Sequence, residues 1–322
     1  MSRTYYLFTS GRLRRKDNTL AFESGEGRRM IPVEDVDHIY CFSELDLNSK
    51  LLDFLGQSQI ILHFFDYYGN YTGSFIPREA QLSGYLIVKQ VEHYANEEKR
   101  LTLARTFVEG AMHNIRRNLE KRAINPTCEQ IDVYRQVLKD ATTIQEVMSI
   151  EAHVRKLYYT QWEEITGWEF GSRSKRPPAN ALNALISFGN AMTYTAVLKE
   201  IRKTALNPTI SYLHEPSERR YSLSLDIAEI FKPVFVDRLI FKLINLNMIT
   251  EQHFDRNINF AYLTPQGRKI FVAEFEQLME KTILHRNLKR NIRYKNLVRL
   301  DLYKLIKHLL DESQYTPMKV WW

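Results

Sequence analysis

The chain is organised around the segment from His214 to Glu229, which reads His-Glu-Pro-Ser-Glu-Arg-Arg-Tyr-Ser-Leu-Ser-Leu-Asp-Ile-Ala-Glu. A polar turn follows the histidine, and the apolar spacing after that turn predicts an amphipathic helix. Asp226 and Glu229 stand three positions apart on this helix, so both carboxylates lie on the same side of it. Two acids and a neutral imidazole are ligands that suit Mg2+ or Mn2+. The segment therefore predicts a divalent metal site.

Arg219 and Arg220 lie between the histidine and the two acids, where they could neutralise the charge of a phosphate. Acid, histidine and arginine in one short segment indicate metal-assisted phosphodiester chemistry. The same residues also have an ordinary structural interpretation. A histidine before a helix is often a cap or a core residue, and an Asp/Glu pair at this spacing is often a solvated helix face. Spacing alone leaves both interpretations open.

The composition is typical of a folded protein. The chain has 322 residues, of which 44% are hydrophobic, and this is enough for one large domain or two ordinary ones. Cys41 and Cys128 have no partner at metal-like spacing, which favours a reduced compartment. The N-terminus lacks the apolar core of a signal peptide, and no apolar run approaches membrane-spanning length. We therefore expect a soluble cytoplasmic protein that contacts no membrane.

Positive charge is concentrated near the C-terminus. Residues 281–310 contain nine basic residues and a single acid, Asp301, in a chain whose formal net charge is +7. Such a basic region on a nearly neutral body indicates a polyanionic partner, most simply nucleic acid. Lys289, Arg290 and Arg293 are candidate DNA-binding residues within it. The alternative is an ordinary basic helix face.

Two parts of the chain differ in their apolar period. Residues 1–76 contain short runs rich in β-branched and aromatic residues, separated by turns. From Pro77 the apolar period changes from two to about 3.6. This pattern predicts an α+β fold, with an N-terminal antiparallel β domain (1–76) followed by a larger all-helical domain (77–322). His63 is predicted to be a core histidine, and the aromatic tail 314–322 to dock on a partner or on its own chain.

A predicted helix from Thr143 to Tyr159 carries Glu151 among apolar neighbours, with Arg155 four positions later. A carboxylate in such surroundings must be paired or bound to a cation, because burying it alone is costly. A Glu–Arg pair at this spacing stabilises a helix only slightly. The residues leave pairing with Arg155 and binding to a cation equally open.

Taken together, these features resemble the family of CRISPR-associated integrases of spacer acquisition. The resemblance rests on the β-rich start, on the helix with Glu151 followed by Tyr158-Tyr159, and on Leu-His-Glu-Pro followed by Arg-Tyr-Ser-Leu-Ser-Leu-Asp-Ile-Ala-Glu-Ile-Phe-Lys-Pro. It covers nearly the whole chain, and the His…Asp-x-x-Glu segment is its most specific part. Two positions depart mildly from the family pattern: Ala152 stands where Gly is usual, and Lys232 where Arg is common.

The resemblance implies site residues, cofactors and partners. It implies that Glu151, His214 and Glu229 are catalytic residues that ligate Mg2+ or Mn2+, with Asp226 as a further catalytic acid in or behind the ligand shell. It also implies a homodimer formed through the β domain. Two such dimers, bridged by a small second CRISPR adaptation protein, would form a heterohexamer that holds double-stranded DNA.

The implied activity is that of an endonuclease and integrase, which inserts short DNA fragments (spacers) into a CRISPR repeat array as part of antiviral defence. A DNA 3′-OH attacks a backbone phosphodiester, so one bond is exchanged for a similar one and no Ser or Tyr nucleophile is required. Two alternatives are a non-catalytic DNA-binding scaffold and a general nuclease of branched DNA. The intact Glu-His-Glu set argues against the scaffold.

Overall fold

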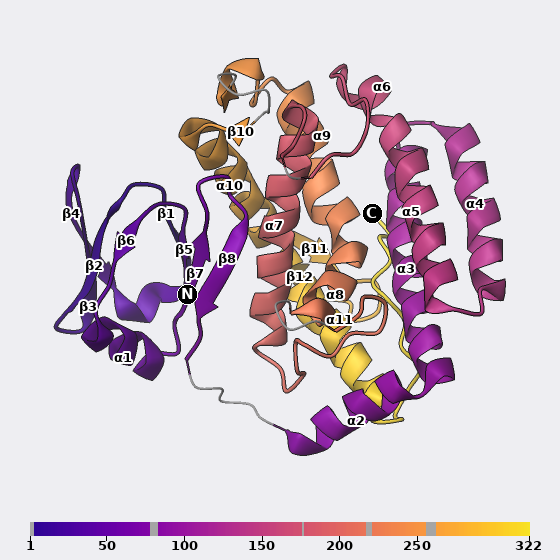
Figure 1. The fold of residues 1–322 in the computed structure, drawn as a ribbon, viewed down its shortest axis with the longest axis horizontal. Helices are drawn as coiled ribbons and strands as arrows, with labels where there is room; N and C mark the ends of the chain where they lie inside the picture. Colours follow the sequence, from indigo (N-terminus) through magenta and orange to yellow (C-terminus); the bar gives the residue numbers. More distant parts are fainter. Residues whose placement is uncertain (1–2, 78–82, 176, 217–220, 256–261) are drawn as a thin grey trace. The chain divides into compact units, whose positions relative to one another are not determined.

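In the computed structural model, which describes residues 3–77, 83–175, 177–216, 221–255 and 262–322, strands precede helices along the chain (Figure 1). The chain divides into two compact units after Ala80, a few residues beyond the position where the apolar period changes in the sequence. The predicted class, a β-rich N-terminal part followed by a larger helical part, is confirmed.

The first unit contains two four-stranded sheets and one α-helix. The strand orders are β4-β3-β2-β6 and β1-β5-β7-β8. The elements are β1 (Arg3–Leu7), β2 (Gly11–Lys16), β3 (Thr19–Ser24), β4 (Gly27–Pro32), a 3-10 turn (Val33–Asp35), β5 (Val36–Cys41), β6 (Leu45–Asp46), α1 (Ser49–Gln57), β7 (Ile61–Phe65) and β8 (Tyr71–Phe75).

The expected antiparallel pairing holds for β2, β3 and β4 and for the hairpin of β7 with β8. It is wrong for β1 with β5, β5 with β7, and β2 with β6, which pair in parallel. Local turns specify the partners in a hairpin, whereas parallel strands are joined by long connections. The connection from β5 to β7 contains β6 and α1, and no local signal in the sequence reveals such a pairing.

The strands of the first unit are held together by buried apolar side chains. Leu13, Leu20, Ile39 and Leu62 are almost fully buried in one apolar core. His63 is also buried, and its Nε2 lies 2.9 Å from Nδ1 of His38, so the predicted core histidine is confirmed. The helix α1 is capped by Asn48, whose side chain accepts the Leu51 N–H.

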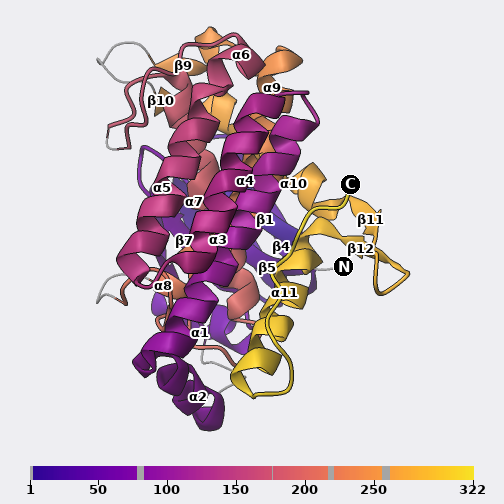
Figure 2. The same cartoon turned by 90° about the vertical axis from the view of Figure 1, so that its right-hand side faces the viewer.

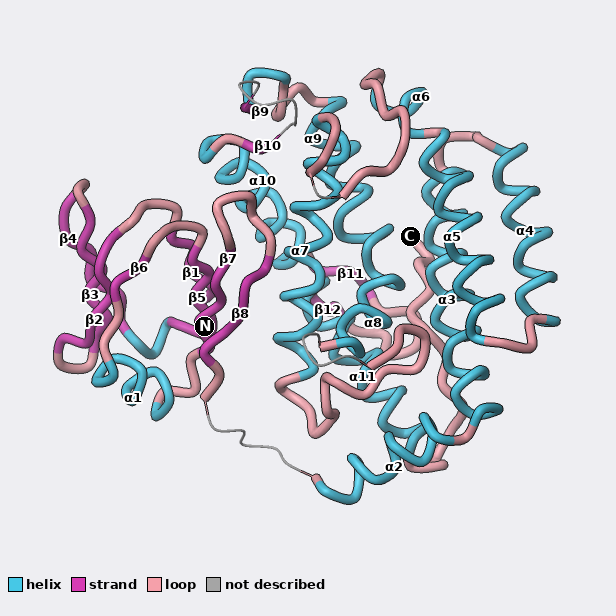
Figure 3. The backbone as a smooth tube through the Cα atoms, in the orientation of Figure 1, coloured by secondary structure: helices cyan, strands magenta, loops and turns pink. Residues whose placement is uncertain are grey.

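The second unit is mostly helical but not entirely so. Figure 3 shows its short strands, which form two hairpins. Its elements are α2 (Gly84–Ala95), α3 (Glu97–Glu120), α4 (Asn125–Asp140), α5 (Ile144–Thr160), α6 (Trp162–Thr166), α7 (Ala181–Ile201), α8 (Ser222–Lys232), a π-helical turn (Pro233–Asp237), α9 (Arg238–Asn245), a 3-10 turn (Glu251–His253), β9 (Phe254–Asp255), β10 (Tyr262–Leu263), α10 (Pro265–Glu280), β11 (Thr282–Leu284), β12 (Asn291–Arg293) and α11 (Tyr294–Leu309).

Three helices, α3, α4 and α5, lie side by side (Figure 2), and α8 packs against both α3 and α7. The start of α5 is fixed by a capping box: the Thr143 side chain accepts the Glu146 N–H, and the Glu146 side chain accepts the Thr143 N–H. Gly189 lets α7 approach the π-helical turn, since a Cβ there would lie 2.4 Å from a Val236 methyl group. Because α3 contacts both α5 and α8, it links these two helices.

The C-terminal tail docks on its own chain. Asn114 of α3 donates to the carbonyl oxygens of Ile230 (2.9 Å) and Met318 (3.0 Å) and accepts the N–H of Val320 (2.8 Å). One side chain thus ties the end of the chain to α8. In the part of the chain that the structure describes, no helix is both long and apolar enough to cross a membrane.

Candidate active site

Asp226 is a fully buried carboxylate on α8 that organises the segment before the helix. Its Oδ2 accepts the backbone N–H groups of Tyr212 (2.7 Å) and Leu213 (3.0 Å). Its Oδ1 accepts the backbone N–H of His214 (3.0 Å). Three successive N–H groups therefore converge on one carboxylate, which compensates for its burial.

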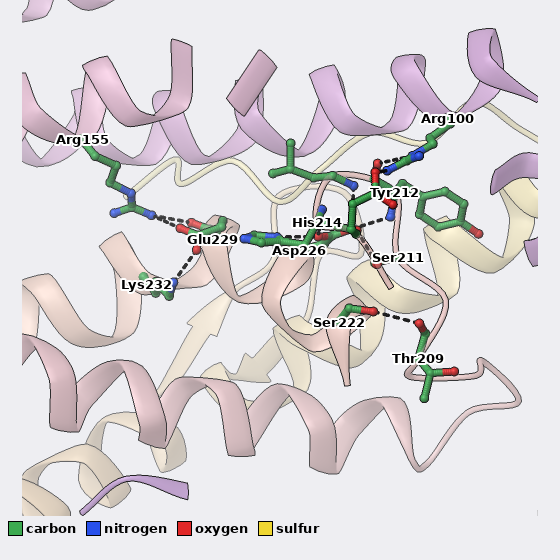
Figure 4. A network of polar contacts seen from close by, with 12 residues as sticks. Arg100, Arg155, Thr209, Ser211, Tyr212, His214, Ser222, Asp226, Glu229 and Lys232 are labelled. Atoms are coloured by element: carbon green, nitrogen blue, oxygen red, sulfur yellow. Dashed lines mark hydrogen bonds and ion pairs between the residues drawn. The ribbon is translucent and has the colours of Figure 1, made fainter. Parts of the chain in front are cut away.

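His214 is oriented by the same carboxylate. Its Nδ1 donates to Asp226 Oδ1 at 2.8 Å, which leaves Nε2 as the ring atom able to bind a ligand. Figure 4 shows the imidazole between Asp226 and Glu229. Burial would lower the pKa of His214, but the hydrogen bond and charge of Asp226, together with the charge of Glu229, raise it.

Glu229 lies on α8 with both carboxylate oxygens bonded to cationic side chains. Arg155 of α5 donates from Nη2 to Oε2 at 2.6 Å, and Lys232, three positions along α8, donates to Oε1. Burial alone would raise the pKa of Glu229, but the charges of Lys232 and Arg155 lower it to about 2. Glu229 is therefore held as a carboxylate although its side chain is only 11% exposed.

Glu151 of α5 is partly exposed, and its Oε1 accepts a hydrogen bond from Arg155 Nε at 3.0 Å. The pairing interpretation of Glu151 is thus correct. It does not exclude a ligand role, because the second carboxylate oxygen, Oε2, takes no part in this bond. Arg155 links Glu151 on one helix to Glu229 on another, and these two acids and His214 come from three separate segments.

The sequence did not reveal all the polar residues around this segment. Arg100 of α3 donates to the Tyr212 carbonyl (3.0 Å) and to Glu215 (2.6 Å). No sequence signal predicts this contact, because more than a hundred residues separate the partners. The Lys232–Glu229 contact, in contrast, follows from spacing, since residues three apart on a helix are neighbours.

The donor set fits a hard divalent cation: two carboxylates and an imidazole whose other nitrogen is fixed by an acid. Asp226 uses both oxygens for Tyr212, Leu213 and His214, so it lies behind the imidazole and not beside Glu229 as a further ligand. Among the described residues, however, no three His, Cys, Asp or Glu side chains are already close enough to share an ion. Both oxygens of Glu229 are already bonded to Arg155 and Lys232, whereas Oε2 of Glu151 takes no part in the bond to Arg155.

Three of the predicted DNA-binding residues lie in the part of the chain that the structure describes. Arg219 and Arg220 lie outside the described residues. Lys289 and Arg290 are exposed in the turn between β11 and β12, while Arg293 is partly buried with its Nε 3.4 Å from a Glu280 carboxylate oxygen. The structure does not bring this turn into the network around His214.

A cavity of about 790 Å³ is lined by α3, α11, the turn between β11 and β12, and the tail. Several of its basic residues already have acidic partners: Arg116 pairs with Asp132, Arg117 with Glu120, and Lys319 with Glu109. These pairs neutralise much of the positive charge that the lining residues would present to an anion.

Comparison with known proteins identifies the family. The model of the family "CRISPR associated protein Cas1" matches residues 5–277. A relative from Moorella thermoacetica, named CRISPR-associated endonuclease Cas1 2, is 75% identical over 320 residues, which cover 99% of this chain and 100% of the relative.

Solved structures agree. A CAS1 protein from Thermotoga maritima has 41% identity and a TM-score of 0.91, with 98% of this chain and 100% of that chain covered. A structure titled "Casposase bound to integration product" shares the fold, with a TM-score of 0.85 at 18% identity and coverage of 98% of this chain and 93% of that one. The predicted family and the predicted enzyme class are confirmed. The chain belongs to the Cas1 family of CRISPR-associated endonucleases.

Proposed function

We propose that the chain joins DNA 3′ hydroxyls to backbone phosphodiesters, inserting spacers into a CRISPR repeat array, with Glu151, His214 and Glu229 holding Mg2+ or Mn2+. The observation that carries this proposal is a chain of contacts that links three distant segments. Arg155 hydrogen-bonds to both Glu151 and Glu229, and Asp226 hydrogen-bonds to the ring of His214. A bound cation would polarise the scissile phosphate and stabilise the leaving oxygen.

The protein's own residues prepare this chemistry. Asp226 fixes the His214 ring through Nδ1 and so directs Nε2 away from the backbone. The raised pKa of His214 means that cation binding must displace a proton at acidic pH, so binding weakens as the pH falls. Glu229 remains ionised at all physiological pH values because its pKa is lowered to about 2.

The tyrosines near the site are poor nucleophiles. Burial raises the pKa of Tyr159 to about 12 and raises the pKa values of Tyr158 and Tyr212. A phenol that resists ionisation is a poor nucleophile, and Tyr158 and Tyr212 are in addition fully buried. This favours direct attack by the DNA 3′-OH, without a covalent protein–DNA intermediate.

The test is a strand-joining assay with a repeat substrate, run beside a simple cleavage assay. Glu151→Ala, His214→Ala and Glu229→Ala should each abolish joining while DNA binding remains, and a chelator should stop the wild-type reaction. Glu129→Ala, which removes an exposed carboxylate on the neighbouring helix α4, is the matched control. Full joining by the His214 variant would overturn the proposal. Cleavage without joining would favour a nuclease of branched DNA, and a denaturation-resistant protein–DNA adduct would favour a tyrosine nucleophile.

The assembly belongs to the same proposal: a cytoplasmic homodimer formed through residues 1–76, with a small second adaptation protein completing a heterohexamer on duplex DNA. The strand β4 supports a role in association, because it ends one sheet and carries Met30, which is 43% exposed. Edge strands of this kind pair readily with another chain. Sedimentation should show a dimer that Met30→Asp weakens, and a wild-type monomer at micromolar concentration would rule the dimer out.

A further inference from the structure

Arg155 occupies a distinctive position between two of the proposed metal ligands. Its Nε donates to Glu151 Oε1 at 3.0 Å, and its Nη2 donates to Glu229 Oε2 at 2.6 Å. The same Nη2 lies 3.3 Å from the Glu229 carbonyl oxygen. The residue is 9% exposed, so these contacts are shielded from water. One guanidinium therefore joins the two carboxylates, and with them α5 and α8.

The guanidinium does for the carboxylates what a metal ion would do. Two acids that approach each other away from water need a positive charge between them, and the planar guanidinium supplies it by donating one N–H group to each carboxylate. Lys232 adds a second cation, but it contacts only Glu229. Arg155 is thus the one described side chain hydrogen-bonded to both acids.

A divalent cation and the guanidinium cannot both hold these carboxylates in the same way. Two positive charges close together in a poorly solvated site repel strongly. A cation bound by Glu151 and Glu229 together would need their oxygens to converge on it, and no such three-ligand arrangement exists among the described residues. The arginine contact with at least one acid must therefore be exchanged for the cation.

We propose that Arg155 is an internal competitor of the metal ion: its bridge between Glu151 and Glu229 opens when the cation binds, and the strength of this bridge sets the metal affinity. The inference rests on the proposed metal site. It assigns Arg155 a positioning role that differs from that of an ordinary supporting residue. A support such as Asp226 keeps its contact when the ligand binds, whereas Arg155 gives up its contact.

The test is a titration of the purified full-length protein with Mn2+ alone, followed by the electron paramagnetic resonance signal of free Mn2+. Arg155→Gln should bind Mn2+ about 10-fold more tightly than the wild type, a difference of about 1.4 kcal/mol in binding free energy. Lys232→Gln is the matched control, because it removes one positive charge from Glu229 but breaks no bridge. The gain in Mn2+ affinity of Lys232→Gln should be smaller than that of Arg155→Gln. Arg155→Lys, which keeps the charge but loses the fork, should fall between the wild type and Arg155→Gln.

The outcomes separate this inference from the proposed function. Weaker or unchanged Mn2+ binding by Arg155→Gln, or a gain no larger than that of Lys232→Gln, would overturn the competitor role. His214→Ala should lose Mn2+ binding with the Arg155 bridge intact. If it retains full affinity, or if no wild-type or Arg155 variant binds Mn2+, the proposed ligand set fails as well. Circular dichroism checks folding, and Arg155→Lys carries the test if Arg155→Gln does not fold, with tighter binding than the wild type expected.

Discussion

Asp226 and Glu229 lie one turn apart on α8, yet their surroundings are opposite in kind. Asp226 is held by three backbone N–H groups and the His214 ring, all of which belong to the fold itself. Glu229 is held by the side chains of Arg155 and Lys232. Backbone donors cannot leave without unfolding the segment, whereas long cationic side chains can rotate away. The contacts of Asp226 are therefore fixed by the fold, whereas those of Glu229 can be exchanged.

The sharpest test of this contrast compares two isosteric substitutions, Asp226→Asn and Glu229→Gln. In the first, an amide NH2 replaces an oxygen that accepts N–H groups, which leaves buried donors unsatisfied at about 1–3 kcal/mol each. Asp226→Asn should therefore lose about 3–5 kcal/mol of unfolding free energy. Glu229→Gln should lose less than about 2 kcal/mol, because Arg155 keeps Glu151. Denaturant unfolding measures both, and equal losses would remove the distinction.

Asp237, in the π-helical turn after α8, is a third carboxylate, and the support it receives from Arg155, Tyr158 and Lys232 does not offset its burial. It is 2% exposed, and its Oδ2 has no hydrogen-bond partner among the described residues. Burial raises its pKa from an ordinary 3.8 to about 7. Between these values the folded protein retains a proton that the unfolded chain releases, so stability should fall as the pH rises from about 4 to about 7.

Asp237→Asn should remove this pH dependence and stabilise the protein at pH 8 by up to about 4 kcal/mol, the value of the full pKa difference. Thermal unfolding across this pH range measures the effect. An unchanged slope in the variant would show that another group titrates there.

Arg100 tests whether the segment before α8 is held from one side only. It contacts the Tyr212 carbonyl and Glu215 from α3, opposite the Asp226 carboxylate. Because it adds two contacts and the Glu215 side chain is 62% exposed, Arg100→Met should cost about 1 kcal/mol, well below Asp226→Asn. A loss as large as that of Asp226→Asn would mean that the segment depends equally on both sides.

The smallest expected effect on stability lies far from α8, in the basic turn. Neutralising Lys289 and Arg290 should change the unfolding free energy by less than about 0.5 kcal/mol. It should also reduce the steepness of the plot of log DNA affinity against log salt concentration by about 2. Neutralising Arg293 and Lys295, which both contact Glu280, is the matched control and should change the slope less. Equal slopes in all these proteins would mean that the turn faces away from DNA.

Local signals predicted the elements well. The Thr143–Glu146 capping box marks the start of α5, and the change in apolar period marks the transition to helices. The i,i+3 spacing correctly placed Asp226 and Glu229 on one helix side. Spacing could not show that one would accept backbone N–H groups and the other two cations, because these partners are set by packing between segments. The parallel pairing of β1 with β5 was missed for the same reason.

Asn114 contacts Ile230, which lies next to Glu229 and is 116 residues away in the sequence, and Met318 and Val320, which are 204 and 206 residues away. Contacts this distant in sequence close long loops, and closing a long loop costs conformational entropy. The hydrogen-bond network around His214 and Glu229 therefore depends on the whole helical unit. An excised peptide from α5 to α8 would contain Glu151, His214 and Glu229 and still lack the framework that brings them together.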